Sequence, residues 1–300
     1  MVRLSAFNRR IPPSLSAKPA VRAFDEDFGK GDATAEAVLG RAAYAKVRAF
    51  IRANRPGVLA GVLEAAAVFK AAGVAAKPLV KEGTAFRKGR KLIVLTGNAG
   101  GILAAERTAL DCLMVLSGIA TETRALSRRF GRRIAATRKS HPGFSAAEKR
   151  AVQVGGGLTH RLSLSDAILV KDNYVEAIAR HRKISYTAAL RWSVRQALAF
   201  RERGRGLAFV EVEVRNRREA LAAAEAGARA ILLDNMRARQ VGLAVKAVRR
   251  IHPGIVIEAS GGITPKNAGK FLAAGADFAS IGSLTLHSRP IDMSLVLDLK

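Results

Sequence analysis

The sequence predicts an α/β fold whose C-terminal half is an incomplete (β/α) barrel. From Arg132 onward, short apolar runs alternate with helical segments, the order expected of a parallel sheet or barrel. In two of these repeats a glycine, Gly227 or Gly275, follows a helix and directly precedes a strand. Glycine is favoured just beyond a helix C-terminus. About six or seven strands can be counted, so we expect an open barrel.

The N-terminal region, residues 33–130, mixes strand and helix signals without regular alternation. Residues 57–74 predict a strand that runs into a helix ending at Gly73. A turn at Gly89 leads into a β-rich segment over 92–96. A long helical pattern with an apolar stripe then covers 102–130.

The C-terminal half supplies the repeated unit. Strands are predicted over 132–137, 166–173, 208–214, 230–235, 255–260 and 277–283. Helices are predicted over 147–155, after 173 through 199, over 218–227, after 235 into 250, and over 264–275.

The composition is that of a globular protein. Hydrophobic residues make up 49% of the chain and charged residues 25%, which is enough for a sizeable core. Cys112 is the single cysteine, so an intramolecular disulfide is excluded and a reducing, cytoplasmic compartment is expected. No apolar run reaches the ~18 residues that span a bilayer, and we expect no membrane segment.

The net charge is unusual, at +27 from 51 basic and 24 acidic residues. Such a field attracts nucleic acids and steers small polyanions. The cations are scattered and only 5% of residues are aromatic, so we expect no specific nucleic-acid partner, and any adhesion should be weak and salt-dependent. Residues 1–24 carry no acid. We expect them to form a basic arm rather than a transit peptide, because Pro12 and Pro13 would break the amphipathic helix.

Polar side chains follow the strands of the barrel half, where barrel enzymes carry their working residues. Cations come first, at Arg138 and Lys139, carboxylates follow at Glu213 and Asp234, and glycines close the set. This order suits a substrate with an anionic ring at one end and phosphates at the other.

Lys171, His160 and Arg161 are further candidates. Lys171 closes an apolar strand, and a compact ammonium there suits a phosphate or carboxylate. His160 and Arg161 follow three glycines. For the histidine, substrate contact and a hydrogen-bonded filling role both remain open.

A glycine turn in 255–271 predicts a phosphate site. Ser260, Gly261 and Gly262 form the turn, and Thr264 is expected at the N-cap with Pro265 at the first helical position. Backbone N–H groups of such a turn bind anions, and the late strands of a barrel commonly hold phosphate. The last strand ends in a similar way, at 282–283.

Two carboxylates, Glu213 and Asp234, end adjacent strands and should share a cavity. Mg²⁺ bridged to substrate phosphate oxygens would offset their repulsion. The alternative is neutralisation by Lys171 or Lys139. Glu211 has the same strand parity as Glu213, so the sequence leaves open which of the two is the working carboxylate.

Eight segments, in order over nearly the whole chain, carry a resemblance to a known family. They are DEDFGKGDAT, ERTALDCLMVLSGIATET, ATRKSHPG, VGGGLTHRLSLSDAILVKDN, VEVEV, ILLDN, EASGGI and SIGSLTLHS. Together they resemble quinolinate phosphoribosyltransferase, the decarboxylating transferase of de novo NAD synthesis.

The resemblance implies an N-terminal α/β sandwich domain followed by an open α/β barrel, working with Mg²⁺ as a homodimer or a multiple of dimers. It implies bounds of 1–118 for the sandwich with its basic arm and 119–285 for the barrel. A C-terminal segment, 286–300, would pack back on the N-terminal domain. The implied partners are quinolinate and phosphoribosyl pyrophosphate.

The same resemblance assigns roles to matching positions. Quinolinate would be bound by Arg107 of the neighbouring subunit and by Thr137, Arg138, Lys139, His160 and Arg161. The ribose and the Mg²⁺–pyrophosphate would be handled by the catalytic residues Lys171, Glu213 and Asp234, the last two also serving the metal. The 5′-phosphate would be held by Ser260, Gly261, Gly262, Gly282, Ser283 and Leu284.

Two departures from the family fall at the quinolinate end. Ser140 and His141 stand where the family usually has two threonines, and Leu158 opens LTHR where it often has HNHR. A same-fold paralogue acting on another aromatic acid, such as the ModD-like proteins, is therefore an alternative, as is a basic nucleic-acid-adhering protein without activity. The retained KDN and VEVE segments favour the quinolinate enzyme.

Overall fold

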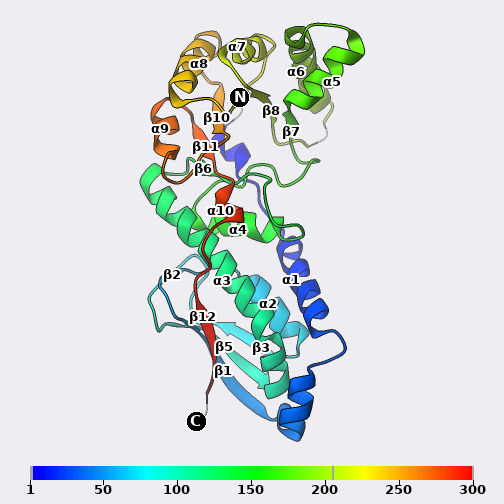
Figure 1. The fold of residues 1–300 in the computed structure, drawn as a ribbon, viewed down its shortest axis with the longest axis vertical. Coiled ribbons are helices and arrows are strands. Elements are labelled where there is room, and N and C mark those ends of the chain that lie inside the picture. Colours follow the sequence, from blue (N-terminus) through cyan, green and yellow to red (C-terminus); the bar gives the residue numbers. More distant parts are fainter. Residues whose placement is uncertain (1–2, 205, 299–300) are drawn as a thin grey trace. The chain divides into compact units, whose positions relative to one another are not determined.

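The computed structural model describes residues 3–204 and 206–298, which divide into two compact units (Figure 1). The barrel unit comprises the N-terminal residues through Arg9, Leu126–Lys139 and Gly157–Ser283. The sheet unit comprises Arg10–Ala125, Ser140–Gly156 and the chain from Leu284 onward. The chain therefore crosses between the units several times, whereas the predicted bounds cut it at 118/119 and 285/286.

The barrel unit is built on six parallel strands in the order β6-β11-β10-β9-β8-β7. Their bounds are β6 Ile134–Ala135, β7 Ile168–Val170, β8 Val210–Val214, β9 Ala230–Asp234, β10 Val256–Ser260 and β11 Phe278–Ser280. Within the described residues, no backbone ladder joins β7 to β6. The predicted α/β fold with an open barrel is confirmed.

Helices follow these strands on the outside of the sheet (Figure 1). They are α5 Asp172–Arg182, α6 Tyr186–Glu202, α7 Arg217–Glu225, α8 Ala238–Ile251 and α9 Ala268–Ala273. The short α10 (Ser283–Leu286) follows β11 and belongs to the sheet unit from Leu284 onward. The single helix predicted through 199 is wrong. Lys183 takes a left-handed conformation (φ 55°) that ends α5, and the Ser185 side chain, which accepts a hydrogen bond from the N–H of Ala188, starts α6.

The N-terminal segment enters the barrel core. A short 3₁₀ helix, η1 (Leu4–Phe7), carries the fully buried Phe7, whose ring stacks on Phe209 at 4.1 Å between centroids. The Phe7 carbonyl accepts a hydrogen bond from the N–H of His160 at 2.7 Å. Residues 13–24, expected to belong to a basic arm, instead lie in helix α1 (Pro13–Phe28), because Pro13 occupies the first helical position, where proline is tolerated.

The sheet unit contains four antiparallel strands in the order β12-β1-β5-β3, with helices against one face. The strands are β1 Lys46–Ala53, β3 Ala75–Pro78, β5 Lys91–Asn98 and β12 Met293–Asp298. The other elements are η2 Ala35–Leu39, η3 Gly40–Tyr44, β2 Gly57–Val58, α2 Val62–Ala71, β4 Ala85–Phe86, α3 Ala99–Phe130 and α4 Ser145–Gly155, with α3 ending in the barrel unit.

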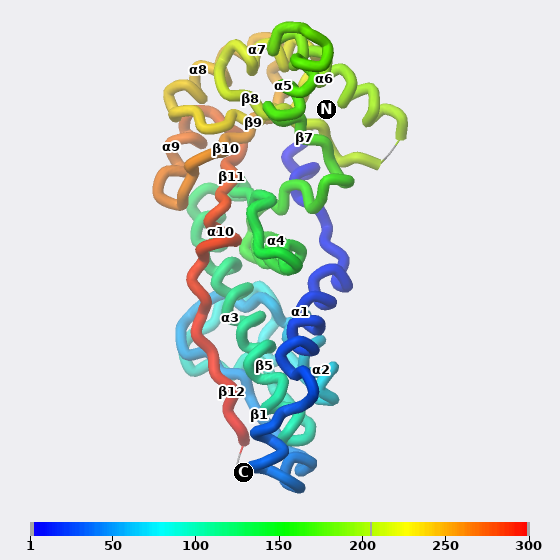
Figure 2. The backbone as a smooth tube through the Cα atoms, turned by 45° about the vertical axis from the view of Figure 1, so that its right-hand side comes forward, coloured from blue at the N-terminus to red at the C-terminus, as the bar shows by residue number. Residues whose placement is uncertain are grey.

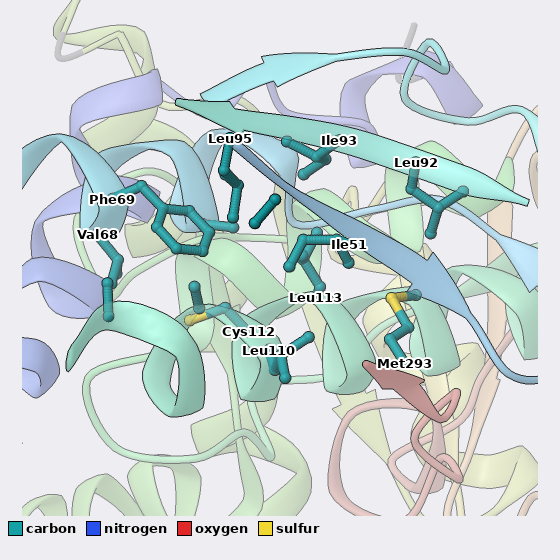
Figure 3. Close-up of a cluster of buried hydrophobic side chains, with 14 of the residues drawn as sticks. Ile51, Val68, Phe69, Leu92, Ile93, Leu95, Leu110, Cys112, Leu113 and Met293 are labelled. Atoms are coloured by element: carbon teal, nitrogen blue, oxygen red, sulfur yellow. The ribbon is translucent and has the colours of Figure 1, made fainter. Parts of the chain in front are cut away.

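The core of the sheet unit lies between the strands and helices α2 and α3 (Figure 3). Ile51 and Leu95 point from the sheet toward Phe69 and Leu113, and all four side chains are fully buried. On the other face of the sheet, Lys46, Arg48, Arg52 and Thr96 are exposed, whereas Phe50 is buried.

Helix α3 runs without interruption through the predicted domain boundary at 118/119. Gly118 lies in mid-helix, and a Cβ there would lie 2.3 Å from the carbonyl oxygen of Arg289. Gly118 therefore allows the C-terminal segment at Arg289 to pack closely against α3, and it does not interrupt the helix. That segment ends in β12, which pairs with β1 although it lies at the other end of the chain (Figure 2).

Candidate active site

The parallel sheet of the barrel unit gathers several predicted site residues at its carboxyl edge. Ser260 at the end of β10 is in register with Asp234 at the end of β9. Glu213 lies one residue before the end of β8. Lys171 directly follows β7, and its Nζ lies 3.4 Å from Oε2 of Glu213. These positions follow from parallel pairing, which aligns the ends of neighbouring strands.

Glu213 and Asp234 form a carboxylate pair beside one ammonium. Burial raises the pKa of Glu213, and the charge of Asp234 raises it further, while Lys171 opposes the shift. Asp234 accepts a hydrogen bond from its neighbour Asn235 at 2.7 Å. Two neighbouring carboxylates repel one another, and their oxygen atoms are the ligands that a divalent cation such as Mg²⁺ prefers. The pair at this partly open edge of the sheet is therefore suited to bind Mg²⁺.

Gly261 allows the turn after β10 to pack against the end of β9. Its φ is +84°, and a Cβ would lie 2.4 Å from Oδ1 of Asn235 and 2.6 Å from the Asn235 backbone nitrogen. That nitrogen donates a hydrogen bond to the carbonyl of Ser260 at 3.0 Å. The glycine turn and the Asp234 strand end are thus held in one arrangement.

The helix start predicted after this turn is wrong. Helix α9 begins at Ala268, not at Pro265. The side chain of Asn267 accepts a hydrogen bond from the N–H of Thr264 at 2.8 Å, and Asn267 N–H donates back to the Thr264 carbonyl at 3.2 Å. These reciprocal bonds stabilise a turn over 264–267 in place of a first helical turn.

We expect Gly261→Ala to reduce activity far more than Gly262→Ala. Both glycines have positive φ, +84° and +62°, so both substitutions carry similar backbone strain, of order 1–3 kcal/mol. Only the Cβ at 261 meets another group, the backbone and side chain of Asn235, because nothing lies within 4 Å of the position at 262. Steady-state kinetics and thermal unfolding of the two variants test this. Equal losses would mean that strain alone matters.

The end of β11 supplies the second glycine turn. A Cβ on Gly282 would lie 3.1 Å from Cδ of Lys139, so the glycine makes room for that side chain. The hydroxyl of Ser283 is buried and has no hydrogen-bond partner within the described residues. A buried polar group of this kind calls for a partner. The Leu284 side chain is fully buried, which leaves only its backbone for a ligand.

Two guanidinium groups face the same region. Arg161 is 6% exposed; burial lowers its pKa, and the nearby charge of Arg138 lowers it further. Arg138 is exposed and follows the end of β6. Thr137 lies in the same segment and accepts a hydrogen bond from the N–H of Lys139 at 3.0 Å. An anion that binds both guanidiniums would relieve their repulsion.

His160 lies in a buried cluster rather than at the open edge. Its Nε2 lies 3.0 Å from Oε2 of Glu211 and 2.9 Å from Oε2 of Glu258, and all three side chains are buried. The imidazole packs beside Phe7 and Phe209 at 5.5 Å and 5.4 Å between ring centroids. The hydrogen-bonded filling role left open by the sequence is the one that these contacts favour.

The protonation of this cluster follows from its hydrogen bonds. Burial lowers the pKa of His160, whereas the charges of Glu258 and Glu211 raise it, and the upward shift means that the three groups together retain an additional proton. The N–H of Arg161 donates to Nδ1 of His160 at 2.8 Å, which requires a lone pair on that atom. We therefore assign the neutral ring with its proton on Nε2. The cluster's additional proton then resides on a carboxyl, in line with the pKa of Glu211, which burial beside Glu258 raises to about 8.

These contacts give Glu211 and Glu213 different surroundings, although strand parity in the sequence does not distinguish them. Glu211 is fully buried and bonded to His160, whereas Glu213 lies at the strand end beside Lys171. The sequence patterns assign no role to Glu258. A glutamate within the apolar run IVIEAS is the signal that marks it, because a buried carboxylate requires a partner.

Arg107 and His141 lie in the sheet unit. Arg107 is exposed on α3, with Nη1 3.4 Å from Oδ1 of Asp111 one helical turn away. His141 Nδ1 lies 2.5 Å from Oε1 of Glu148. The role of Arg107 in a neighbouring subunit stays a prediction.

Comparison with known proteins links this geometry to one family. Models described as quinolinate phosphoribosyl transferase match the chain, the N-terminal domain over residues 32–117 and the C-terminal domain over 119–296. The chain is 36% identical over 276 residues to a probable nicotinate-nucleotide pyrophosphorylase (carboxylating) of Methanothermobacter thermautotrophicus, covering 90% of this chain and 94% of that protein.

Two further similarities extend over almost the whole chain. The nicotinate-nucleotide pyrophosphorylase (carboxylating) of Rattus norvegicus is 34% identical over 292 residues, covering 96% of this chain and 92% of the relative. The solved nicotinate-nucleotide pyrophosphorylase of Francisella tularensis superposes with a TM-score of 0.82 at 29% identity, covering 97% and 99% of the two chains.

Proposed function

The chain belongs to the quinolinate phosphoribosyltransferase family, and from this premise we propose how its residues perform the family's reaction. The activity is transfer of phosphoribose from phosphoribosyl pyrophosphate to quinolinate with decarboxylation, which yields nicotinate mononucleotide, pyrophosphate and CO₂. None of the helices in residues 3–204 and 206–298 combines the length and apolar character needed to cross a membrane.

The ring end of the site is assigned to Arg138 and Arg161, with Thr137 and Lys139 beside them. Quinolinate carries two carboxylates, and guanidinium groups bind carboxylates through two parallel hydrogen bonds. The mutual repulsion of Arg138 and Arg161 supports this assignment, because a dianion would relieve it. His160 would act here indirectly, by accepting the N–H of Arg161 and so orienting that residue.

The phosphoribosyl end is assigned to the later strands. The turn at Ser260–Gly262 and the Gly282–Ser283 pair offer backbone N–H groups and the unpartnered Ser283 hydroxyl to the 5′-phosphate. Glu213 and Asp234 would hold Mg²⁺ together with substrate oxygens. When bound, the ion neutralises the charge that develops on the departing pyrophosphate.

The chemistry requires positioning, charge stabilisation and exclusion of water. As the ribose C1–O bond to pyrophosphate breaks, the sugar gains oxocarbenium character, and Lys171 stabilises the negative charge on the leaving group. The quinolinate nitrogen attacks C1, and the new C–N bond makes the nitrogen cationic. That positive charge stabilises the electron pair left on the adjacent ring carbon when CO₂ departs, and a proton then replaces the carboxylate.

The observation that carries this function is the arrangement of cations, carboxylates and glycine turns along one edge of a six-stranded parallel sheet. Purified protein incubated with quinolinate, phosphoribosyl pyrophosphate and Mg²⁺ should release CO₂ and form nicotinate mononucleotide. Turnover of a different aromatic acid, with quinolinate inert, would identify a paralogue. The absence of any transfer would leave a binding protein.

We also propose a cytoplasmic enzyme that works as a homodimer with shared sites. The free thiol of Cys112 is buried, and burial raises its pKa to about 12, so it suits a reducing compartment and an inert structural role.

Complementation tests the shared site. An Arg107→Ala chain and a Lys171→Ala chain should each be nearly inactive, and activity should reappear when they are mixed and exchange subunits. A hybrid dimer with shared sites carries both defects in one site and neither in the other. Restored activity of up to about one quarter of wild type is expected, because half of the dimers are hybrids with one intact site each. No recovery after demonstrated exchange would place Arg107 within its own chain's site or outside the reaction.

A further inference from the structure

The outer face of the four-stranded sheet carries cations that the catalytic chemistry does not use. Strand β1 places Lys46, Arg48 and Arg52 on this face, and β3 and β5 add Lys77 and Lys91. All five side chains are exposed. We define these five residues as the basic sheet face, which lies on the strands labelled β1, β3 and β5 in Figure 1.

Among the residues that the structure describes, no carboxylate pairs with these cations as carboxylates do with cations of the barrel unit. None of the five forms an ion pair within residues 3–204 and 206–298, and Asp298, in register with Arg48, is the one acid that the described sheet strands carry. In contrast, Arg191 pairs with Glu225 at 2.5 Å and Arg249 with Asp277 at 2.9 Å in the barrel unit.

The face retains like charges at a cost in stability. Arg52 is in register with Lys91 across the β1–β5 pair, and like charges directly opposite each other destabilise a sheet. Lys91 Nζ lies 3.6 Å and Arg48 Cζ 5.1 Å from the centroid of the Phe50 ring. Two cations therefore pack over the ring of Phe50, which is only 7% exposed.

We propose that the basic sheet face binds single-stranded nucleic acid without sequence preference. Alternate residues of an antiparallel strand are about 6.8 Å apart, so Lys46 and Arg48 lie at a spacing comparable to that of successive phosphates in an extended strand, and Arg52 lies at about twice that spacing from Arg48. Arginine guanidinium groups also stack on unpaired bases. A membrane surface fits less well, since Val296, 38% exposed, is the one large exposed apolar side chain on the sheet strands.

The test uses two triple variants of the full chain that remove equal charge. The sheet variant is Lys46→Glu, Arg52→Glu, Lys77→Glu, which spares the cations packed on Phe50. The control variant is Lys246→Glu, Arg250→Glu, Lys270→Glu, which changes two exposed cations of helix α8 and one of helix α9. Binding to labelled oligothymidylate is measured by fluorescence anisotropy over a range of salt concentrations, beside a duplex of equal length and phosphatidylserine vesicles.

We expect the sheet variant to bind the single strand at least about tenfold more weakly and to lose about 2 from the slope of log K against log salt, at about 0.7 per phosphate contact. Its transferase activity should be unchanged, because the basic sheet face contains no residue of the site. The control variant should keep most of the affinity. Equal loss in both variants, no loss in the sheet variant, tighter binding to the duplex, or binding to vesicles alone would each overturn the proposal.

Discussion

Arg138→Ala is expected to weaken quinolinate binding by about 2 kcal/mol or more, which is roughly thirtyfold, while phosphoribosyl pyrophosphate binding changes little. Arg138 lies three residues beyond the end of β6, close enough to Arg161 for its charge to lower the pKa of that residue. The carboxylates of quinolinate are expected between these two guanidinium groups. The glycine turns assigned to the 5′-phosphate lie at the ends of other strands, β10 and β11. Removing one guanidinium should therefore affect one ligand selectively.

Calorimetric titration with each substrate separately measures this effect. Arg132→Ala is the matched control, because it removes an equally exposed arginine upstream of β6 and should leave both affinities intact. Arg138→Lys keeps the charge but loses the planar fork, and an intermediate affinity is expected. Equal losses for both substrates in Arg138→Ala would contradict the assignment of this segment to the ring.

His160→Ala is expected to lower the free energy of unfolding by about 2–5 kcal/mol, from a lost buried hydrogen-bond donor and a new cavity. The substitution leaves Glu211 and Glu258 buried beside each other without the Nε2 proton that both of them contact. It also opens a cavity beside Phe7, which packs against the imidazole. Denaturant unfolding measures the loss. His181→Ala, at an exposed histidine of α5, should change stability by less than about 0.5 kcal/mol.

The same cluster gives the stability a defined pH dependence. The pKa of Glu211 is raised from 4.5 to about 8 in the folded chain, so the folded state holds a proton that the unfolded state releases between these values. The stabilising contribution is complete below pH 4.5 and is lost as the pH rises to about 8. Glu211→Gln, which carries no titrating proton, should gain stability relative to wild type over this range. A constant difference between the two proteins at pH 5 and pH 8 would contradict the assignment.

Much of the fold and of the candidate site was predictable from short-range patterns. The alternation of apolar runs and helical segments predicts the parallel sheet, because the hydrophobic periodicity of a segment reflects how that one strand or helix is buried. The residue that follows an apolar run also identifies which side chain lies at the end of the strand. Lys171, Asp234 and Gly261 were therefore found at the carboxyl edge without knowledge of any contact. The segments that resemble the family added the reaction, which geometry at strand ends alone does not specify.

Contacts between segments distant in the chain were not predictable in this way. Nothing near Phe7 in the sequence indicates that it fills the barrel core, and the continuous helix α3 crosses the boundary that the family resemblance implies at 118/119. Glu211 and Glu213 have the same strand parity, yet one contacts His160 and Glu258 while the other contacts Lys171.

The sequence by itself therefore determined the fold class, the family and the residues of the strand ends, because local periodicity and motif order encode them. The tertiary structure decided which carboxylate is buried, where His160 lies and which cations remain without carboxylates on the sheet. These properties depend on the strand register, the packing of distant segments and the loss of solvent around a charge, all of which arise only once the chain has folded.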